Sequence, residues 1–349
     1  MRNLLLASVA VAGFAMATSP AGAGTWVSPV TVSGSSSMSV FGITDANVIS
    51  GDYVSSSSGV QHGFVGPFNG SNYTSFDDGG GTTQPRGMNN KGYIAGYDIT
   101  TLTPWERTPG GTLTDVTKKG TTLNQLAQGM NKHNVFAGNY DDTSGVSVGY
   151  LGKNAKFMSK IRLPISNSGV AGRGVDAAGD VTGWFIDTST GLQHAYLIIG
   201  GTATQVDYPA AKYTVGEGLN DKGIMSGQYE DSSSLLHGFI YKISTGKFTA
   251  LDIPGGSNTQ VWGISNSDVV AASYPGAANG YVYCMKATTC PAPGVEVVEK
   301  EITVPLKSMP HYPCVNGCRT PLAPNAIHVG SWMPRAPQLA PGKFAPAQP

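Results

Sequence analysis

The segment GLNDKGIMSGQY, residues 218–229, is one copy of a pattern that occurs six times in this chain of 349 residues. Its first glycine belongs to a set of six that can be overlaid, with successive members 42 to 45 residues apart. The six opening glycines are Gly42, Gly87, Gly129, Gly174, Gly218 and Gly263. Self-similarity at such a period is the signature of a repeat architecture. A residue type that recurs at one offset is therefore interpreted as structural, and a residue that breaks the pattern is a candidate for function.

The middle of the pattern predicts a tight turn. Five residues after each opening glycine, the chain has a residue type that tolerates left-handed backbone angles. These positions are Asn47, Gly92, Asn134, Gly179, Gly223 and Asp268. We expect a positive φ at these turn positions, and a preceding Asn or Asp can bond to its own backbone.

The residues on either side of this turn alternate between apolar and small or polar types, which predicts a β-hairpin. A second small residue, such as Gly227, leaves space that we expect an aromatic ring from an adjacent repeat to fill. An aromatic residue also follows closely in each repeat: Tyr53, Tyr97, Tyr140, Phe185, Tyr229 and Tyr274.

Two further strands complete each repeat. The third is expected at segments such as 237–241, which begins His-Gly-Phe, and the fourth at segments such as 247–255. Four short strands in about 44 residues, repeated six times, predict an all-β six-bladed β-propeller over residues 24–290. No segment has a sustained period of 3.6 residues, so helices should be scarce.

The last repeat has no clear fourth strand after residues 280–284. Residues 25–32, which precede the first repeat, have the composition of a strand. We expect this segment to provide the outer strand of the last blade, because closing the ring removes open sheet edges that invite aggregation.

The combined pattern of the repeat resembles the bacterial extracellular HAF-repeat family. The resemblance depends on Gly-apolar-Asn-x-x-Gly, then His-Gly/Ala-Phe/Tyr, then Phe-Thr-x-Leu-Asp-x-Pro-Gly, and it covers about residues 41–285. It is strongest in the fifth repeat. The resemblance implies a secreted bacterial repeat protein with a propeller-like fold, and it implies no established activity.

The two ends of the chain differ from the repeats. Residues 1–23 combine a basic start, a short apolar run and the small-residue site Ala21-Gly22-Ala23, which predicts a secretory signal peptide. No other segment approaches the roughly 20 apolar residues of a membrane-spanning helix, so we expect a secreted or periplasmic protein. Residues 291–349 contain about half of the 22 prolines and no repeat, which predicts a Pro-rich, mostly irregular tail.

Charge and motifs exclude several classes of function. The chain has 22 basic and 22 acidic residues and no basic stripe, so it has no electrostatic footprint for nucleic acid. The sequence contains no nucleophile elbow, zinc-protease helix, phosphate-binding loop or dinucleotide fingerprint. We therefore assign no catalytic residue and expect no cofactor.

The four cysteines are Cys284, Cys290, Cys314 and Cys318, and an even number in an exported chain indicates disulfides. Proximity favours the pairs Cys284–Cys290 and Cys314–Cys318, although a cross-pairing would attach the tail to the last blade. A zinc site is the alternative for the tail, with the ligands His311, Cys314, Cys318 and His328.

Other candidate metal ligands have a simpler structural interpretation. His62, His194 and His237 occupy equivalent places in three repeats, so the propeller would hold them apart, and we expect them to bond backbone groups at a strand start. The acidic pairs 141–142 and 230–231 lie in loops and lack the regular oxygen-ligand spacing of a calcium site. We interpret them as solvated loop charges.

One column varies among aromatic, cationic and anionic residues although its neighbours are nearly fixed. It is the residue before each opening glycine: Phe41, Arg86, Gln128, Arg173, Glu217 and Trp262. This column should begin the innermost strand of each blade and ring one mouth of the central channel. Functional residues concentrate in such places on rigid scaffolds. The alternative is that the column is merely exposed and unconstrained.

This column suggests a binding or interaction module for a small polar molecule, a glycan or another exported protein. Its arginines offer donor forks for carboxylates or hydroxyls, and its aromatic residues offer faces for stacking. The alternative function is a carbohydrate-active hydrolase or lyase, which would need paired carboxylates or a metal. The column contains a single carboxylate, Glu217, so an enzyme is the less favoured of the two.

Overall fold

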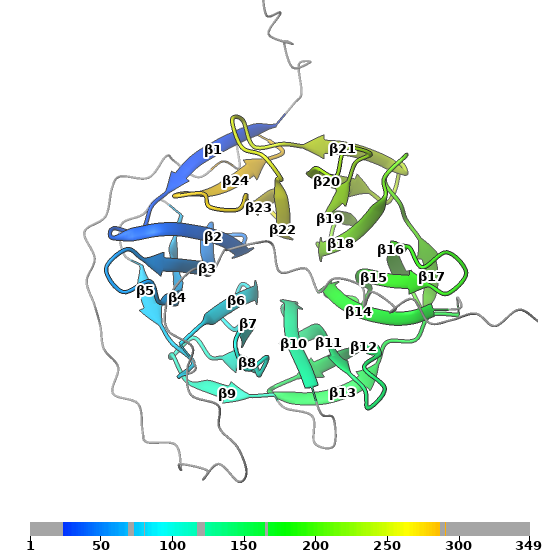
Figure 1. The fold of residues 1–349 in the computed structure, drawn as a ribbon, viewed down its shortest axis with the longest axis horizontal. Helices are drawn as coiled ribbons and strands as arrows, with labels where there is room; N and C mark the ends of the chain where they lie inside the picture. Colours follow the sequence, from blue (N-terminus) through cyan, green and yellow to red (C-terminus); the bar gives the residue numbers. More distant parts are fainter. Residues whose placement is uncertain are drawn as a thin grey trace, which may run out of the picture.

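The computed structural model of the chain contains six four-stranded antiparallel sheets arranged around a central axis (Figure 1). The structure describes residues 24–68, 73–79, 81–116, 123–164, 167–286 and 290. The predicted signal peptide and Pro-rich tail lie outside the described residues. The sheets confirm the expected all-β six-bladed propeller, and the described residues contain no helix.

The first three blades run in sequence order from the innermost to the outermost strand. Blade 1 has β2 (Ser35–Ile43), β3 (Val48–Ser55), β4 (Gln61–Pro67) and β5 (Thr74–Phe76). Blade 2 has β6 (Thr83–Met88), β7 (Ile94–Asp98), β8 (Pro104–Arg107) and β9 (Leu113–Asp115). Blade 3 has β10 (Leu123–Met130), β11 (Val135–Asp141), β12 (Ser147–Lys153) and β13 (Lys156–Lys160).

The next two blades repeat this order, and the last blade takes its outer strand from the start of the chain. Blade 4 has β14 (Asn167–Val175), β15 (Val181–Asp187), β16 (Gln193–Ile199) and β17 (Thr202–Gln205). Blade 5 has β18 (Tyr213–Leu219), β19 (Ile224–Glu230), β20 (Leu236–Lys242) and β21 (Lys247–Leu251). Blade 6 has β22 (Gln260–Ile264), β23 (Val269–Ser273), β24 (Gly280–Cys284) and β1 (Thr25–Val30).

The pairing of β1 with β24 confirms the expected ring closure. Thr25 pairs with Cys284 and Val27 with Val282, in antiparallel register. Val30 is 1% exposed and belongs to the core cluster shared by the first and last blades. The ring is therefore closed by strand pairing between the two ends of the propeller sequence.

The opening glycines bring neighbouring innermost strands unusually close together. A Cβ atom added to Gly87 would lie 2.3 Å from the carbonyl oxygen of Gln128 and 2.6 Å from the Cα of Gly129. A Cβ on Gly129 would lie 2.3 Å from the carbonyl oxygen of Arg173. These distances are below any normal contact, so the six glycines set how narrow the channel is.

The turn after each opening glycine has the predicted geometry. The value of φ is between 59° and 87° at all six turn positions: Asn47, Gly92, Asn134, Gly179, Gly223 and Asp268. In blade 5, the Asn220 side chain accepts hydrogen bonds from the backbone N–H groups of Lys222 and Ile224. The same amide donates to the carbonyl oxygen of Ser265 in blade 6 at 3.0 Å. One residue thus stabilises its own turn and joins it to the next blade.

The hydrophobic core lies between neighbouring blades. Its packing differs from one expectation of the sequence analysis and adds detail to another. The space at the second small residue is filled by a ring from the third strand of the same blade, as Phe64 does at Gly51, and not by an adjacent repeat. An aromatic residue does follow closely in each repeat, but not at one register position: in blade 2 Tyr97 pairs with Gln84 and lies one position earlier than the other five. A one-residue offset places a strand residue on the opposite face.

Replacing an opening glycine should destabilise the ring through backbone overlap. We expect Gly129→Ala to lower the free energy of unfolding by about 1–3 kcal/mol or more, because the added methyl meets a carbonyl oxygen that cannot rotate away. Gly110→Ala is the matched control, since the nearest atom to its Cβ would be 3.9 Å away. Urea denaturation of both variants tests this, and equal midpoints would contradict the proposed close approach.

The closing strand gives a second stability prediction. Val30→Asp should destabilise the protein by several kcal/mol, because the new carboxylate would be buried without a partner. Val60→Asp introduces the same charge at a side chain that is 38% exposed, and it should have little effect. Thermal unfolding of the two variants distinguishes a closing strand that supports the ring from one that merely lies against it.

Candidate functional site

The variable column coincides with a β-bulge in the innermost strands. In blade 1, Val40 pairs with Gly51 and Gly42 pairs with Ser50, which leaves Phe41 without a partner residue. The register shifts at the same point in the other blades, at Arg86, Gln128, Arg173, Glu217 and Trp262 or the adjacent glycine. Bulges often lie beside functional sites, where they redirect a side chain.

The strands begin earlier than the sequence analysis expected. The column was expected to begin each innermost strand, but β6 begins at Thr83, three residues before Arg86. The reason is that residues before the bulge continue to pair with the second strand, as Gln84 does with Tyr97. The column residues therefore lie within the channel and not at the start of the strand.

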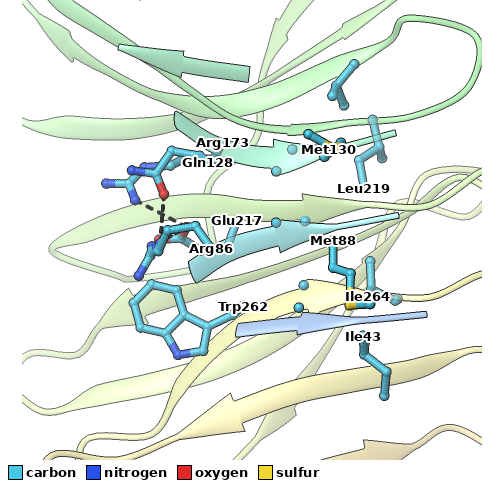
Figure 2. A pocket seen from close by; sticks show the side chains of 17 residues that line it. Ile43, Arg86, Met88, Gln128, Met130, Arg173, Glu217, Leu219, Trp262 and Ile264 are labelled. Atoms are coloured by element: carbon cyan, nitrogen blue, oxygen red, sulfur yellow. Dashed lines mark hydrogen bonds and ion pairs between the residues drawn. The ribbon is translucent and has the colours of Figure 1, made fainter. Parts of the chain in front are cut away.

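Five of the six column residues line a small cavity in the channel, on the side of the opening glycines away from the turns (Figure 2): Arg86, Gln128, Arg173, Glu217 and Trp262. The cavity volume is about 50 Å³. Trp262 is half-buried, whereas the other four residues are at most 9% exposed. Phe41 is 3% exposed and does not line the cavity, so the column forms a buried cluster and not an open rim.

Glu217 lies between two guanidinium groups. Its Oε2 atom is 3.7 Å from a terminal nitrogen of Arg86 and 3.6 Å from one of Arg173. Both distances exceed that of a normal hydrogen bond. The other carboxylate oxygen accepts a hydrogen bond from the amide of Gln228 at 3.2 Å. The three charged groups leave one positive charge in excess.

The two arginines differ in the hydrogen bonds and ring contacts that their guanidinium groups make. Arg86 donates from Nε to Gln128 Oε1 at 2.8 Å. Its guanidinium carbon also lies 4.0 Å from the centroid of a Trp262 ring and 4.7 Å from that of Phe41. Arg173 makes no hydrogen bond within the described residues, and its side chain is 8% exposed. Arg173 Nε and Gln128 Nε2 are thus buried donors without an acceptor.

Trp262 and Phe41 are less available for stacking than the sequence suggested. Their rings meet edge to face, with centroids 5.0 Å apart, and the Arg86 guanidinium lies over both. The Trp262 indole N–H donates to the Ser273 hydroxyl at 3.0 Å. Arg86 therefore forms part of the structural support of the site.

A second buried column, on the second strands, was missed by the sequence analysis. Its members pair with the residue two positions before the bulge: Asp52, Tyr97, Asn139, Trp184, Gln228 and Ser273. All six are at most 8% exposed, and Gln228 and Ser273 bond directly to the first column. The signal was present in the sequence, because these residues follow the second small residue and vary as widely as the first column.

Asp52 is the acidic member of this second column. Its Oδ2 atom accepts hydrogen bonds from Gln61 at 2.7 Å and Gln84 at 3.2 Å. Burial nevertheless raises the pKa of Asp52 to about 7, against the hydrogen bond from Gln84 and the charge of Arg86. The site thus contains a second carboxyl group, which carries little of its charge below neutral pH.

The opposite end of the channel has a different character. Beyond the glycines, the cavity is lined by a ring of apolar side chains, all but Val175 labelled in Figure 2: Ile43, Met88, Met130, Val175, Leu219 and Ile264. The turns then form the other mouth, where Asn266 N–H donates to Asp45 at 2.6 Å and so joins the last blade to the first. These polar groups bond mostly to one another, and the apolar ring separates them from the arginine cluster.

The three equivalent histidines form separate pairs with aspartates, and their partners are carboxylates where backbone groups were expected. The Nδ1 atoms of His62, His194 and His237 lie 2.8, 2.8 and 2.9 Å from Asp77, Asp207 and Asp252. Each pair connects the third strand of a blade to the end of its fourth strand. Among the described residues, no group of three or more potential ligands could hold a metal ion.

Two further sets of residues were assigned from the sequence. Cys284 and Cys290 form the expected disulfide, with Cα atoms 5.4 Å apart. His311, Cys314, Cys318 and His328 lie outside the described residues. In the acidic loops, Asp142 and Asp231 accept hydrogen bonds from backbone N–H groups of their own turns, at 2.8 to 3.1 Å. These two carboxylates cap turns and are not simply solvated charges.

Comparisons with known proteins identify no family and no function for this chain. No protein-family model and no curated protein sequence matches the chain. Similar solved structures include a chain of a nidogen–laminin complex, at 12% identity over 65% of this chain and 84% of that one, with a TM-score of 0.41. Because identity and TM-score are both low, this similarity indicates no activity or ligand for the chain.

Two bacterial structures are similar to the same degree. One is a catalytically inactive virginiamycin B lyase from Staphylococcus aureus with quinupristin, at 11% identity, covering 78% and 93% of the two chains, with a TM-score of 0.38. The other is a protein of unknown function from Bacteroides thetaiotaomicron, at 11% identity, covering 75% and 76%, with a TM-score of 0.49. These two matches likewise indicate no activity or ligand. No helix among the described residues is long and apolar enough to span a membrane.

The raised pKa of Asp52 predicts a specific pH dependence of stability. The folded protein keeps the Asp52 proton up to about pH 7, whereas the unfolded chain loses it near 3.8. Stability should therefore fall as pH rises from about 4 to 7, and Asp52→Asn should remove a loss of up to about 4 kcal/mol. Urea denaturation at pH 5 and pH 8 measures about 3 kcal/mol of this loss, the part that falls between pH 5 and pH 7. Asp115→Asn, at an exposed side chain, is the control.

If the pH dependence of Asp52→Asn matches that of the wild type, Asp52 ionises near its ordinary pKa. That result would show that burial does not raise the pKa of Asp52.

Proposed function

We propose that this chain is an exported binding module whose ligand enters the end of the channel lined by Arg86, Gln128, Arg173, Glu217 and Trp262. The observation that supports this most directly is Arg173, a buried guanidinium with no hydrogen bond among the described residues. A buried donor without a partner costs about 1–3 kcal/mol, and more when it is charged. A ligand that accepts from Arg173 would recover this energy.

The position of the cluster also supports a binding role. The residues come from five blades that are far apart in sequence, and each lies at or beside a bulge of its innermost strand. The surrounding ring is rigid, because neighbouring strands lie so close together at the glycines that no side chain fits between them. Binding groups on rigid strands are held more accurately than groups on loops.

The size of the cavity limits which ligands can be fully enclosed. A buried cavity of about 150 Å³ in another protein is sufficient for benzene. The channel cavity measures about 50 Å³, so it accommodates a small functional group and not a complete sugar ring. A glycan or a protein partner would therefore insert only a side group, with its remainder outside the channel.

A carbohydrate-active hydrolase or lyase is the second candidate, and one observation favours it. Two carboxyl groups lie near Arg86, Glu217 in the cavity lining and Asp52 outside it, and burial raises the pKa of Asp52 to about 7. A carboxyl group that keeps its proton near neutral pH can act as a general acid. The small cavity is the argument against this role, because the scissile bond of a glycan would have to reach Asp52.

Export and the HAF-repeat relationship are part of the same proposal. They are supported by the predicted signal peptide, by the repeat pattern and by the Cys284–Cys290 disulfide, which is typical of oxidising compartments. An extracytoplasmic location would expose the channel to small molecules of the surroundings.

A thermal-shift screen of metabolites and oligosaccharides tests the proposed site. We expect at least one compound to raise the melting temperature of the wild type, and Arg173→Gln should abolish that shift. Lys132→Gln removes a cation near the opposite mouth, where its side chain is 52% exposed, and should leave the shift intact. A shift that persists in Arg173→Gln would place the site elsewhere, and chemical conversion of the compound would favour the enzyme.

A further inference from the structure

The unsatisfied groups of the channel also indicate the chemistry of its ligand. We propose that the end of the channel binds the carboxylate group of a small organic acid, between Arg173 and Gln128. This inference rests on the proposed function, because it specifies the ligand class of the same site.

The cavity lining has hydrogen-bond donors that are not used within the described part of the protein. The two polar atoms of the cavity-lining residues that are buried without a partner, Arg173 Nε and Gln128 Nε2, are both donors. Arg173 is 7% exposed and Gln128 is 2% exposed, so solvent reaches their donors poorly. Figure 2 shows the two side chains next to each other at the same end of the channel. The unused donors of the cavity lining require a ligand with acceptors. Among the described residues, the buried second-column acceptors without a partner, Gln228 Oε1 and Asn139 Oδ1, belong to residues that do not line the cavity.

The charged groups around the cavity leave one positive charge in excess. Arg86 and Arg173 contribute two positive charges, and Glu217, 3.6 to 3.7 Å from both, contributes one negative charge. Asp52 lies close enough to Arg86 to interact with its charge, and burial favours the protonated form of Asp52 up to about pH 7. The tyrosines that interact with these charges, Tyr97, Tyr196 and Tyr213, are neutral, since burial raises the pKa of each. One excess positive charge matches a singly charged anion.

The guanidinium group and the size of the cavity both match a carboxylate group. A guanidinium presents its N–H groups as a planar fork that matches the two oxygens of a carboxylate. A cavity of about 50 Å³ holds a group of that size. Phosphate or sulfate dianions would reverse the net charge of the site, from one excess positive charge to one excess negative charge. A carboxylate therefore fits better than these inorganic anions.

Titration calorimetry with defined probes tests the ligand class. The probes are acetate, propionate and benzoate, with acetamide as the neutral match to acetate, and sulfate and phosphate as inorganic anions. We expect at least one carboxylate to bind, and acetamide and the inorganic anions to bind at least tenfold more weakly. Arg173→Gln should weaken carboxylate binding at least tenfold. Lys132→Gln should not change it.

A measurement on the wild type keeps the test valid if Arg173→Gln does not fold. The ¹⁵N resonance of the Arg173 Nε–H group is assigned in the wild type through its connection to the backbone resonances of Arg173. We expect this resonance to shift on titration with the carboxylate that binds, and to stay in place with acetamide.

The possible results separate the ligand class from the site. Equal binding of acid and amide, preference for sulfate or phosphate, or no binding of any carboxylate would overturn the carboxylate proposal. The proposed function would survive those results if another compound still bound in an Arg173-dependent manner. Carboxylate binding that Arg173→Gln leaves unchanged would overturn both. A capped dipeptide acid that binds more tightly than every free acid would assign the carboxylate to a peptide instead of a small molecule.

Discussion

The close approach of the six innermost strands at the opening glycines is the constraint on which the rest of this propeller depends. At Gly87, Gly129 and Gly263, a Cβ atom would lie 2.3 to 2.6 Å from a carbonyl oxygen of the next blade. Any side chain at these positions would push neighbouring strands apart and widen the ring. Without side chains there, the channel is narrow enough for residues of distant blades to meet. Arg86 of blade 2 can therefore contact Trp262 of blade 6 and approach Glu217 of blade 5.

The polar turn residues fix the same ring from the other end of the channel. An asparagine amide has an acceptor and a donor, and Asn89, Asn131 and Asn220 use both, capping their own turn and donating to a carbonyl of the next blade at 2.7 to 3.0 Å. The hydroxyl groups of Thr44 and Ser265 accept hydrogen bonds from backbone N–H groups of their own turns. A hydroxyl group is too short to reach the carbonyl of the next blade as well. Asparagine is preferred at this turn position because its amide can form hydrogen bonds within its own blade and to the next blade at the same time.

The features that the sequence predicted correctly depend on local backbone conformation or on counting. The turn residues could be recognised because few residue types tolerate positive φ, and the closing strand because the sixth repeat lacked its fourth strand. The β-bulge could not be predicted, since it is a change of register between two strands that the repeat pattern does not encode. The place of Tyr97 in the second buried column could have been read from the sequence, because Tyr97 follows its small residue Gly96 directly, and a shift of one residue exchanges the two faces of a strand.

The candidate site was predictable as a set of positions but not as a set of contacts. Arg86 and Arg173 occupy the same position of the repeat and share a backbone conformation that ends in a bulge. Arg86 is satisfied by Gln128 and two aromatic rings, whereas Arg173 has a single carboxylate 3.6 Å away. The difference lies entirely in side chains contributed by other blades, some of them on the far side of the channel. A repeat alignment can therefore identify the variable column, while the chemistry of each member depends on the closed ring.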